Sequence, residues 1–166
     1  MPEETTFQKR QVAYKVPVSL IIESQFSKDE LSAGFIQINE LKISRVNIIG
    51  TIIYTSDKAS SWSATLDDGT GRINLRTFEQ NPLFLNNEVG DLVLMVGRIR
   101  EFSNEKYIIP EVIKKVENIK WFDVRKEEIS KSNFQNVVEI KNEAVEEIIE
   151  QKTTQTDDIF GIIKSL

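Results

Sequence analysis

The chain has 166 residues, 40% of them hydrophobic, which is enough for one globular domain with appendages. It contains no cysteine and no histidine, which excludes disulfides, thiolate nucleophiles, cysteine-ligated zinc and the most common general base of enzymes. The formal net charge is -5, but residues 44–116 carry nine basic and nine acidic side chains, so the acidic excess lies in the flanks and a nucleic-acid partner is not excluded.

Residues 1–43 are predicted to form an N-terminal extension. A polar tip, MPEETTFQKR, precedes the apolar run VAYKVPVSLIIE. Because Pro17 interrupts this run, the pattern favours a strand or an extended arm over a helix. The run is shorter than the ~20 residues of a membrane-spanning helix and follows no basic leader, so we expect an intracellular protein without a signal peptide.

Residues 44–116 are predicted to form a domain of β-strands. Five segments either alternate apolar and polar side chains or are rich in Val, Ile and Tyr: 44–55, 60–68, 71–78, 91–102 and 106–116. In the third segment Ile73 and Leu75 alternate with polar residues, so one face of that strand is apolar and the other polar. Trp62 falls on the apolar face of the second segment and is expected in the core or in an interface.

Gly50 and Gly97 lie inside the first and fourth of these segments. Glycine within a strand marks a bulge or a sharp bend, and the long strands of a small barrel must bend to serve both of its sheets. Five strands, with room for a short helix after the third, indicate a mainly β protein: a five-stranded Greek-key barrel, the OB-fold, followed by a C-terminal α-helix. The pattern by itself also suits an SH3-like barrel.

The stretch DDGTG, residues 67–71, separates the second and third segments. Glycine accepts positive φ and aspartate bonds to nearby backbone, so the stretch is predicted to be a hairpin turn. A calcium loop would need further oxygen ligands and a distal Glu. A phosphate loop would need Gly-Lys-Ser/Thr leading into a helix. We therefore expect no metal and no cofactor.

Residues 117–152 are predicted to be a connector and a C-terminal helix, and 153–166 a tail or the start of a further element. Between about 134 and 151, apolar residues recur at helical spacing. The stripe consists of Val137, Ile140, Ala144, Val145, Ile148 and Ile149. This is more apolar surface than a lone helix usually exposes, so we expect the helix to dock on another chain or to fold back on the barrel.

A resemblance to a known family rests on three stretches that occur in order: ISRVNIIGTIIYT, LDDGTGRINLRTF and VGRIREFSNEKYI. They resemble the middle-subunit (32 kDa-like) OB-fold of replication protein A, the single-stranded DNA-binding complex of eukaryotes and archaea. The start, RQVAYKVPVSLIIESQF, resembles the lead-in of archaeal replication protein A-associated proteins. The resemblance implies a non-enzymatic subunit of an archaeal heterotrimer that protects single-stranded DNA in replication, recombination and repair.

The resemblance also implies where DNA bases would stack. In the family, one aromatic at the end of the third strand and another just after the fourth stack on bases, and the matching residues are Phe78 and Phe102. Phe78 lies on the strand face opposite the apolar residues, which suits a stacking platform. The alternative is that Phe78 packs under residues 79–90 and that Phe102 anchors a turn.

Phosphate contacts are expected from basic side chains near these aromatics. The family has a basic residue two positions before the first aromatic, which corresponds to Arg76, and the alternation of the fourth strand puts two more arginines on one face. The full set is Arg76, Arg98, Arg100 and Lys106. The alternative is that the arginines are solvated or paired with Glu79, Glu101 and Glu105. The side on which Tyr107 lies is left open.

In the family, the helix after the barrel packs against the equivalent helices of two other subunits, which makes the stripe on 134–151 the expected subunit interface. A winged-helix domain often follows, and here only DDIFGIIKSL stands in its place, so that function is not expected. Two alternatives stay open: an assembly subunit with little DNA binding of its own, or an OB module that binds RNA or tRNA.

Overall fold

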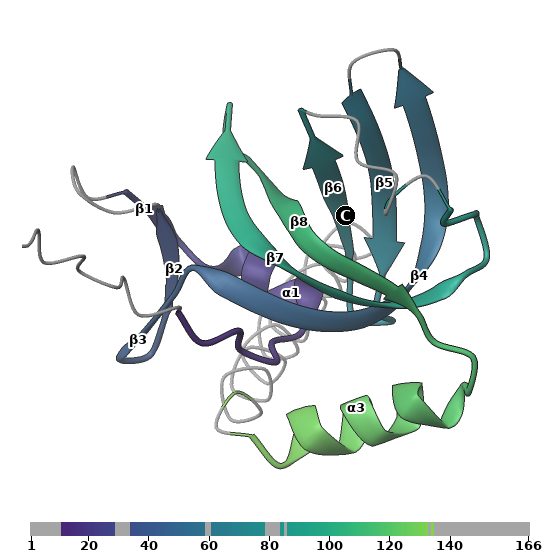
Figure 1. The fold of residues 1–166 in the computed structure, drawn as a ribbon. Helices are drawn as coiled ribbons and strands as arrows, with labels where there is room; N and C mark the ends of the chain where they lie inside the picture. Colours follow the sequence, from purple (N-terminus) through teal and green to yellow (C-terminus); the bar gives the residue numbers. More distant parts are fainter. Residues whose placement is uncertain are drawn as a thin grey trace, which may run out of the picture. The chain divides into compact units, whose positions relative to one another are not determined.

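The computed structural model describes residues 11–28, 34–58, 61–78, 84, 86–132 and 134 (Figure 1). The chain divides into two compact units, Met1–Ile129 and Ser130–Leu166. The elements described below belong to the first unit, except that Ser130, the last residue of the helix after the barrel, belongs to the second. Within the described part of the chain, no helix has the length and apolar character needed to cross a membrane.

Five strands form a closed barrel, in the order β4-β5-β6-β8-β7. Their bounds are Arg45–Lys58 (β4), Ser61–Asp67 (β5), Arg72–Thr77 (β6), Leu92–Phe102 (β7) and Glu105–Lys115 (β8). β4 closes the barrel by pairing with both β5 and β7, and all pairs are antiparallel except β6 with β8. The predicted fold class, a mainly β five-stranded OB-fold barrel followed by a helix, is confirmed.

Both strand glycines lie where another backbone comes close. A Cβ on Gly97 would be 2.5 Å from Cγ2 of Ile108 and 2.6 Å from the carbonyl oxygen of Ile109, and the β7–β8 register shifts between Val96 and Gly97. A Cβ on Gly50 would be 2.7 Å from the carbonyl oxygen of Asp67. The glycines therefore let strands approach each other where the barrel closes.

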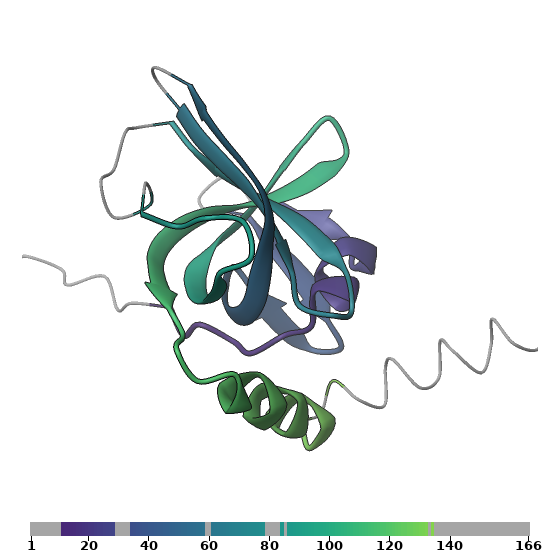
Figure 2. The ribbon, with the colours of Figure 1, turned by 90° about the vertical axis from the view of Figure 1, so that its right-hand side faces the viewer.

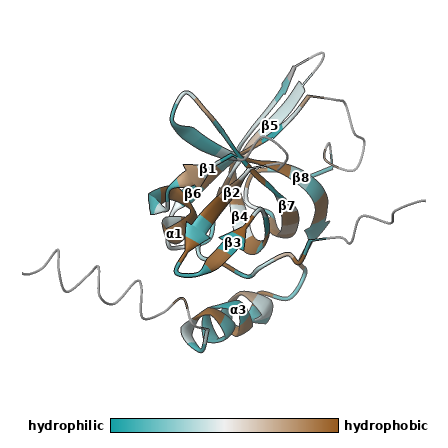
Figure 3. Cartoon of the chain, turned by 90° about the vertical axis from the view of Figure 1, so that its left-hand side faces the viewer, coloured by the Kyte–Doolittle hydropathy of each residue, from teal (hydrophilic) through white to brown (hydrophobic). Residues whose placement is uncertain are grey.

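Alternation along the strands fills the inside of the barrel. β5 and β6 bury every second residue, and Trp62 is buried and stacks on Phe84 with ring centroids 5.7 Å apart, so its predicted place in the core is confirmed. In Figure 3 hydrophobic colour gathers in the body of the fold, whereas the outer part of β5 is pale. The largest fully buried side chains of the barrel are Ile48, Ile52, Leu66, Leu75, Met95, Ile99 and Ile108.

The apolar run after Pro17 is a helix, α1 (Val18–Glu23), so the expected strand or extended arm is wrong for these residues. Residues 11–16, before Pro17, are not helical, and Tyr14 forms a parallel bridge with Val46 of β4. Pro17 is the N-cap residue, with φ -65° and ψ 146°, so it precedes the helix instead of interrupting it. At this position the missing N–H of proline removes no helical hydrogen bond. α1 packs against β6 (Figure 2). Its Val18, Leu20 and Ile21 are buried.

Three short strands follow α1 and form a separate antiparallel sheet: β1 (Phe26–Ser27), β2 (Phe35–Ile38) and β3 (Leu41–Ile43). Phe35, Ile36, Ile38 and Ile43 are buried. The N-terminal extension thus contributes core residues as well as a helix.

A helix follows the barrel, α3 (Lys120–Ser130), in the region where the sequence pattern indicated a connector. Its buried Arg125 donates to Asn47 of β4 twice, at 2.7 Å to the carbonyl oxygen and 2.9 Å to Oδ1. Burial lowers the pKa of the Arg125 guanidinium, and the nearby Glu128 carboxylate opposes that shift. The predicted interface stripe, Val137, Ile140, Ala144, Val145, Ile148 and Ile149, lies outside the described residues.

Candidate nucleic-acid interface

Most of the residues predicted from the sequence to bind nucleic acid lie on one outer face of the barrel. Successive side chains of a strand point to opposite sides, and residues directly opposite each other in a ladder share a side. On β6 the outward residues are Arg72, Asn74 and Arg76, with Phe78 just past its end. We call the surface the β6–β8–β7 face, and it consists of Asn74, Arg76, Phe78, Arg100, Phe102, Glu105 and Tyr107.

The two phenylalanines are both exposed, each with 69% of its surface accessible. Phe102 ends β7 opposite Glu105, and the two residues between them, Ser103 and Asn104, have φ of 51° and 64°. These positive values make a tight two-residue turn, which holds Phe102 at the tip of the hairpin. A large exposed aromatic ring has a free face on which a planar ligand can stack.

Tyr107, which the sequence left unassigned, lies on this face. It is directly opposite Arg100 of β7 and pairs with Asn74 of β6. The guanidinium carbon of Arg76 lies 5.1 Å from the centre of the Tyr107 ring, a cation–π contact. The ring thus sits between two basic side chains that come from different strands.

Tyr54 of β4 is an exposed aromatic that sequence reasoning did not nominate. It pairs with Thr65 of β5, directly after a register shift between Ile52 and Tyr54. That bulge breaks the simple alternation of β4, so the side on which Tyr54 lies does not follow from the sequence pattern.

Two of the basic residues predicted to contact phosphates, Arg76 and Arg98, form ion pairs with acidic side chains of the barrel. Arg76 pairs with Glu105 at 3.1 Å, which is one of the pairings considered from the sequence. Arg98 pairs with Glu111 at 2.7 Å, and Arg45 reaches the same carboxylate at 2.5 Å. Arg98 therefore belongs to a cluster with β4, beside the β6–β8–β7 face.

Lys106 and Arg100 are tied to backbone carbonyls. Nζ of Lys106 donates to the Ile22 carbonyl of α1 at 2.9 Å and lies 3.7 Å from Glu101, and its side chain is only 12% exposed. Arg100 donates from Nη1 to the Ile99 carbonyl at 2.9 Å. Lys106 therefore joins the tip of the β7–β8 hairpin to α1. Beside it lies a small polar pocket lined by Ile22, Arg72, Asn74, Asn104, Glu105 and Lys106.

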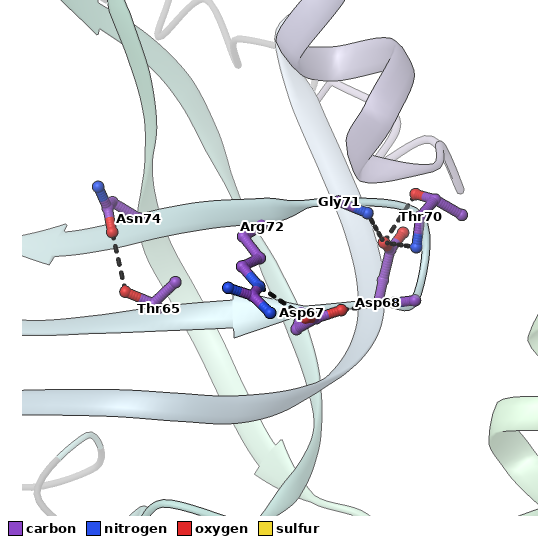
Figure 4. Close-up of polar contacts among 8 residues, drawn as sticks. Thr65, Asp67, Asp68, Thr70, Gly71, Arg72 and Asn74 are labelled. Carbon is purple, nitrogen blue, oxygen red and sulfur yellow. Dashed lines mark hydrogen bonds and ion pairs between the residues drawn. The ribbon is translucent and has the colours of Figure 1, made fainter.

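The DDGTG turn is held by its own aspartates (Figure 4). Oδ1 of Asp68 accepts from the Thr70 N–H at 2.9 Å, the Thr70 hydroxyl at 2.7 Å and the Gly71 N–H at 3.1 Å. Its Oδ2 accepts from the Val18 N–H at 2.9 Å, at the start of α1. Both carboxylate oxygens of Asp68 are therefore occupied by the chain itself.

Asp67 has a different set of partners in the same turn. It accepts from the Gly69 N–H at 2.8 Å and from Arg72 at 3.0 Å, and these contacts lower the pKa of its carboxyl. Among the described residues, no three acidic side chains are grouped so that they would hold a metal ion. The structure therefore assigns the aspartates to turn geometry and helix capping.

Sequence comparisons find two relatives, and no protein-family model matches the chain. The uncharacterized protein MJ1654 of Methanocaldococcus jannaschii is 32% identical over 123 residues, which cover 74% of this chain and 49% of that protein. A replication protein A 32 kDa subunit of Oryza sativa subsp. japonica is 23% identical over 112 residues, which cover 65% of this chain and 37% of that protein. The chain thus spans about half the length, or less, of the curated relatives it matches.

Solved structures share the fold. A chain of a replication protein A heterotrimer bound to single-stranded DNA matches with a TM-score of 0.63 at 14% identity, over 75% of this chain and 98% of that chain. Yeast replication protein A bound to single-stranded DNA matches with a TM-score of 0.60 at 24% identity, over 78% of this chain and 95% of that chain. The S. pombe Stn1–Ten1 complex matches with a TM-score of 0.64 at 16% identity, over 81% of this chain and 99% of that chain. The chain therefore has the OB-fold found in replication protein A and Stn1–Ten1, and its resemblance to the replication protein A 32 kDa subunit is confirmed.

Proposed function

We propose that this chain is a single-stranded DNA-binding subunit of an archaeal replication protein A-like complex, which protects single strands in replication, recombination and repair. The proposal is supported by the similarity to the replication protein A 32 kDa subunit and to an archaeal protein. Two structures with the same fold hold single-stranded DNA. The subunit is proposed to act by binding, without catalysis.

The observation that carries the proposal is the pair of exposed phenylalanines on the β6–β8–β7 face. Phe78 follows β6 and Phe102 is the last residue of β7, and each exposes 69% of its surface. Two exposed aromatic rings on one face, beside basic side chains, are the arrangement expected of a surface that binds planar ligands. Bases of a single strand supply flat rings of the right kind at regular spacing.

The proposed mechanism combines stacking with phosphate contacts. Stacking of one base on one aromatic is worth roughly 1–3 kcal/mol and tolerates any sequence. Arg76, Arg98 and Arg100, with Lys106 at the edge, would meet the phosphates, and the affinity would fall with salt because counterions are released. We expect no reading of base identity.

Other subunits are proposed as protein partners. The structural neighbours include a replication protein A heterotrimer and the Stn1–Ten1 complex, which are both assemblies of several chains. The stripe of Val137, Ile140, Ala144, Val145, Ile148 and Ile149 is the surface that we propose for this contact, because apolar residues at helical spacing favour packing against other helices.

The proposal is tested by fluorescence anisotropy of labelled oligo-dT with the whole chain over a salt series. We expect the wild type to bind and the double variant Phe78→Ala/Phe102→Ala to lose at least about 30-fold in affinity, since two stacking contacts are removed. Trp121→Ala is the matched control, because Trp121 is an exposed aromatic on α3, outside the proposed face. Its affinity should equal that of the wild type.

Two results would contradict the proposal, and each points to one alternative. If oligo-dT binds only when a partner protein is present, and the double variant acts like the wild type in that complex, the chain is an assembly subunit. If a structured RNA binds as tightly as oligo-dT or more tightly, the chain is an RNA-binding OB module.

A further inference from the structure

Glu105 is an acidic residue on the face proposed for DNA, at the hairpin end of β8. It pairs directly with Phe102, and its side chain is 54% exposed. A carboxylate repels a phosphate, so a residue of this kind is unexpected on a surface that binds nucleic acid. The hydrogen bonds of its carboxylate show what Glu105 does on this face.

Both oxygens of Glu105 bind residues of the same face. Oε1 accepts from Nδ2 of Asn74 at 2.7 Å, and Oε2 accepts from Nη2 of Arg76 at 3.1 Å. Asn74 and Arg76 are alternate residues of β6 and are 31 and 29 positions away in the chain. These are donors that a phosphate group of a bound strand would use, because carboxylate and phosphate oxygens accept the same hydrogen bonds from guanidinium and amide groups.

We propose that Glu105 acts as an internal substitute for a backbone phosphate and limits the affinity of the face for single-stranded DNA. This inference rests on the proposed function of the chain. A strand that contacts Arg76 must either displace the Glu105 carboxylate or place a phosphate beside it. Glu105 is therefore an affinity-determining residue of the site, and the exchange of one anion for the other keeps binding reversible.

The position of the ion pair suits such an exchange. The pair is partly exposed to water, and an exposed ion pair contributes little to stability, so its opening costs little. Arg98 and Arg45 share Glu111, whose side chain is only 26% exposed. Glu111 is thus held by two arginines from two strands, which makes it the less readily displaced of the two acids.

The experiment compares wild type, Glu105→Gln and Glu40→Gln in the oligo-dT titration over a salt series. Glutamine keeps an oxygen acceptor for Asn74 and removes the charge. We expect Glu105→Gln to bind oligo-dT about five-fold more tightly than the wild type at low salt. This is the change in affinity expected when one contact between like charges near ~4 Å in water is removed. The slope of log affinity against log salt should steepen by up to about 0.7.

Glu40→Gln is the charge-matched control, because Glu40 is exposed in the turn between β2 and β3, away from the proposed face. It should change the affinity far less, because salt screens distant charges. Glu105→Ala should change the affinity in the same direction as Glu105→Gln. In an Arg76→Gln background the gain from Glu105→Gln should be smaller than in the wild-type background, because the competition for that guanidinium is gone and only the repulsion between carboxylate and phosphate remains.

The inference is overturned if Glu105→Gln binds as the wild type does, binds more weakly, or gains no more than Glu40→Gln. Weaker binding would mean that Glu105 positions Arg76 for the strand. If the wild type binds and loses affinity in the Phe78→Ala/Phe102→Ala variant while Glu105→Gln gains nothing, only this inference fails. If neither wild type nor Glu105→Gln binds any oligonucleotide, the proposed function fails as well.

Discussion

Asp68 joins two segments that are far apart in the chain. Its carboxylate accepts from Thr70 and Gly71 within the turn and from the N–H of Val18, 50 residues away, and the side chain is buried. The Ser19 N–H also reaches the turn, through the Thr70 hydroxyl at 3.2 Å. Pro17, at the N-cap, makes no side-chain cap hydrogen bond, so the turn of the barrel supplies the cap of α1.

For this residue we predict that Asp68→Ala lowers the free energy of unfolding by about 2–4 kcal/mol, because it leaves the buried N–H of Val18 and the N–H groups of Thr70 and Gly71 without their acceptor. Urea denaturation followed by circular dichroism measures this. Asp57→Ala, at an exposed position of β4, should stay within about 0.5 kcal/mol of the wild type. Equal effects of the two substitutions would show that the cap of α1 contributes nothing to stability.

Among the elements, α1 stands out because it is part of the core. Leu20 is 2% exposed and Ile21 is fully buried, whereas Ile22 of the same helix is 44% exposed. The helix is only six residues long, and a helix of that length is not stable alone in water. Its stability therefore comes from packing on the barrel, from the cap that Asp68 supplies and from Lys106, which donates to its Ile22 carbonyl.

We predict that Leu20→Ala lowers the free energy of unfolding by about 2–5 kcal/mol, because it removes buried methyl groups and leaves a cavity. Ile22→Ala, on the exposed side of the same helix, should cost much less. Chemical denaturation of the whole chain compares the two. A similar small cost for both variants would mean that α1 is only loosely attached and that the barrel is stable without it.

Across the molecule, one ion pair links the N-terminal segment to α3 and another joins two segments of the barrel. Lys15 pairs with Glu128 of α3 at 2.5 Å, and Asp91 pairs with Lys115 at 2.5 Å. The Lys15 ammonium is the main cause of the lowered pKa of Glu128, and the Glu88 N–H and then Lys115 lower the pKa of Asp91. Asp67 has a lowered pKa from Gly69 and Arg72.

These shifts predict how stability depends on pH. A carboxyl whose pKa is lower in the folded chain than in the unfolded chain stabilises the fold above the unfolded value, and this contribution disappears as the pH falls through the folded value. The ordinary pKa values are 3.8 for Asp and 4.5 for Glu. We therefore expect Tm to fall as the pH is lowered from about 5 toward 2.

Asp91→Asn should flatten this dependence, because the variant has one fewer carboxyl with a lowered pKa. Calorimetry between about pH 6 and pH 2.5 on the wild type, Asp91→Asn and the control Asp57→Asn measures the slopes. A curve for Asp91→Asn that runs parallel to that of the wild type would show that the Asp91 carboxylate, with its bonds to the Glu88 N–H and to Lys115, does not contribute to acid sensitivity.

The barrel and the outward phenylalanines could be predicted from the sequence alone. Side chains in a strand alternate with a period of two, so Ile73 and Leu75 could be placed inside and Phe78 outside from their spacing. Glycines inside two long strands marked positions where another backbone comes close, and the DDGTG stretch indicated a hairpin turn. These are local properties, and a local property is visible in a linear pattern.

The remaining features became visible only in the folded chain, because they depend on contacts between distant segments. The helix after Pro17 is short and needs Asp68 and a buried site on β6, so the local pattern did not indicate it. The side taken by Tyr107 depends on the parallel register of β6 and β8. The partners of the arginines also depend on strand pairing: Glu105 of β8 reaches Arg76 of β6 across 29 positions, and Glu111 of β8 reaches Arg45 of β4 across 66. Strand register across a barrel is set by packing of the whole fold, and no short stretch of sequence contains it.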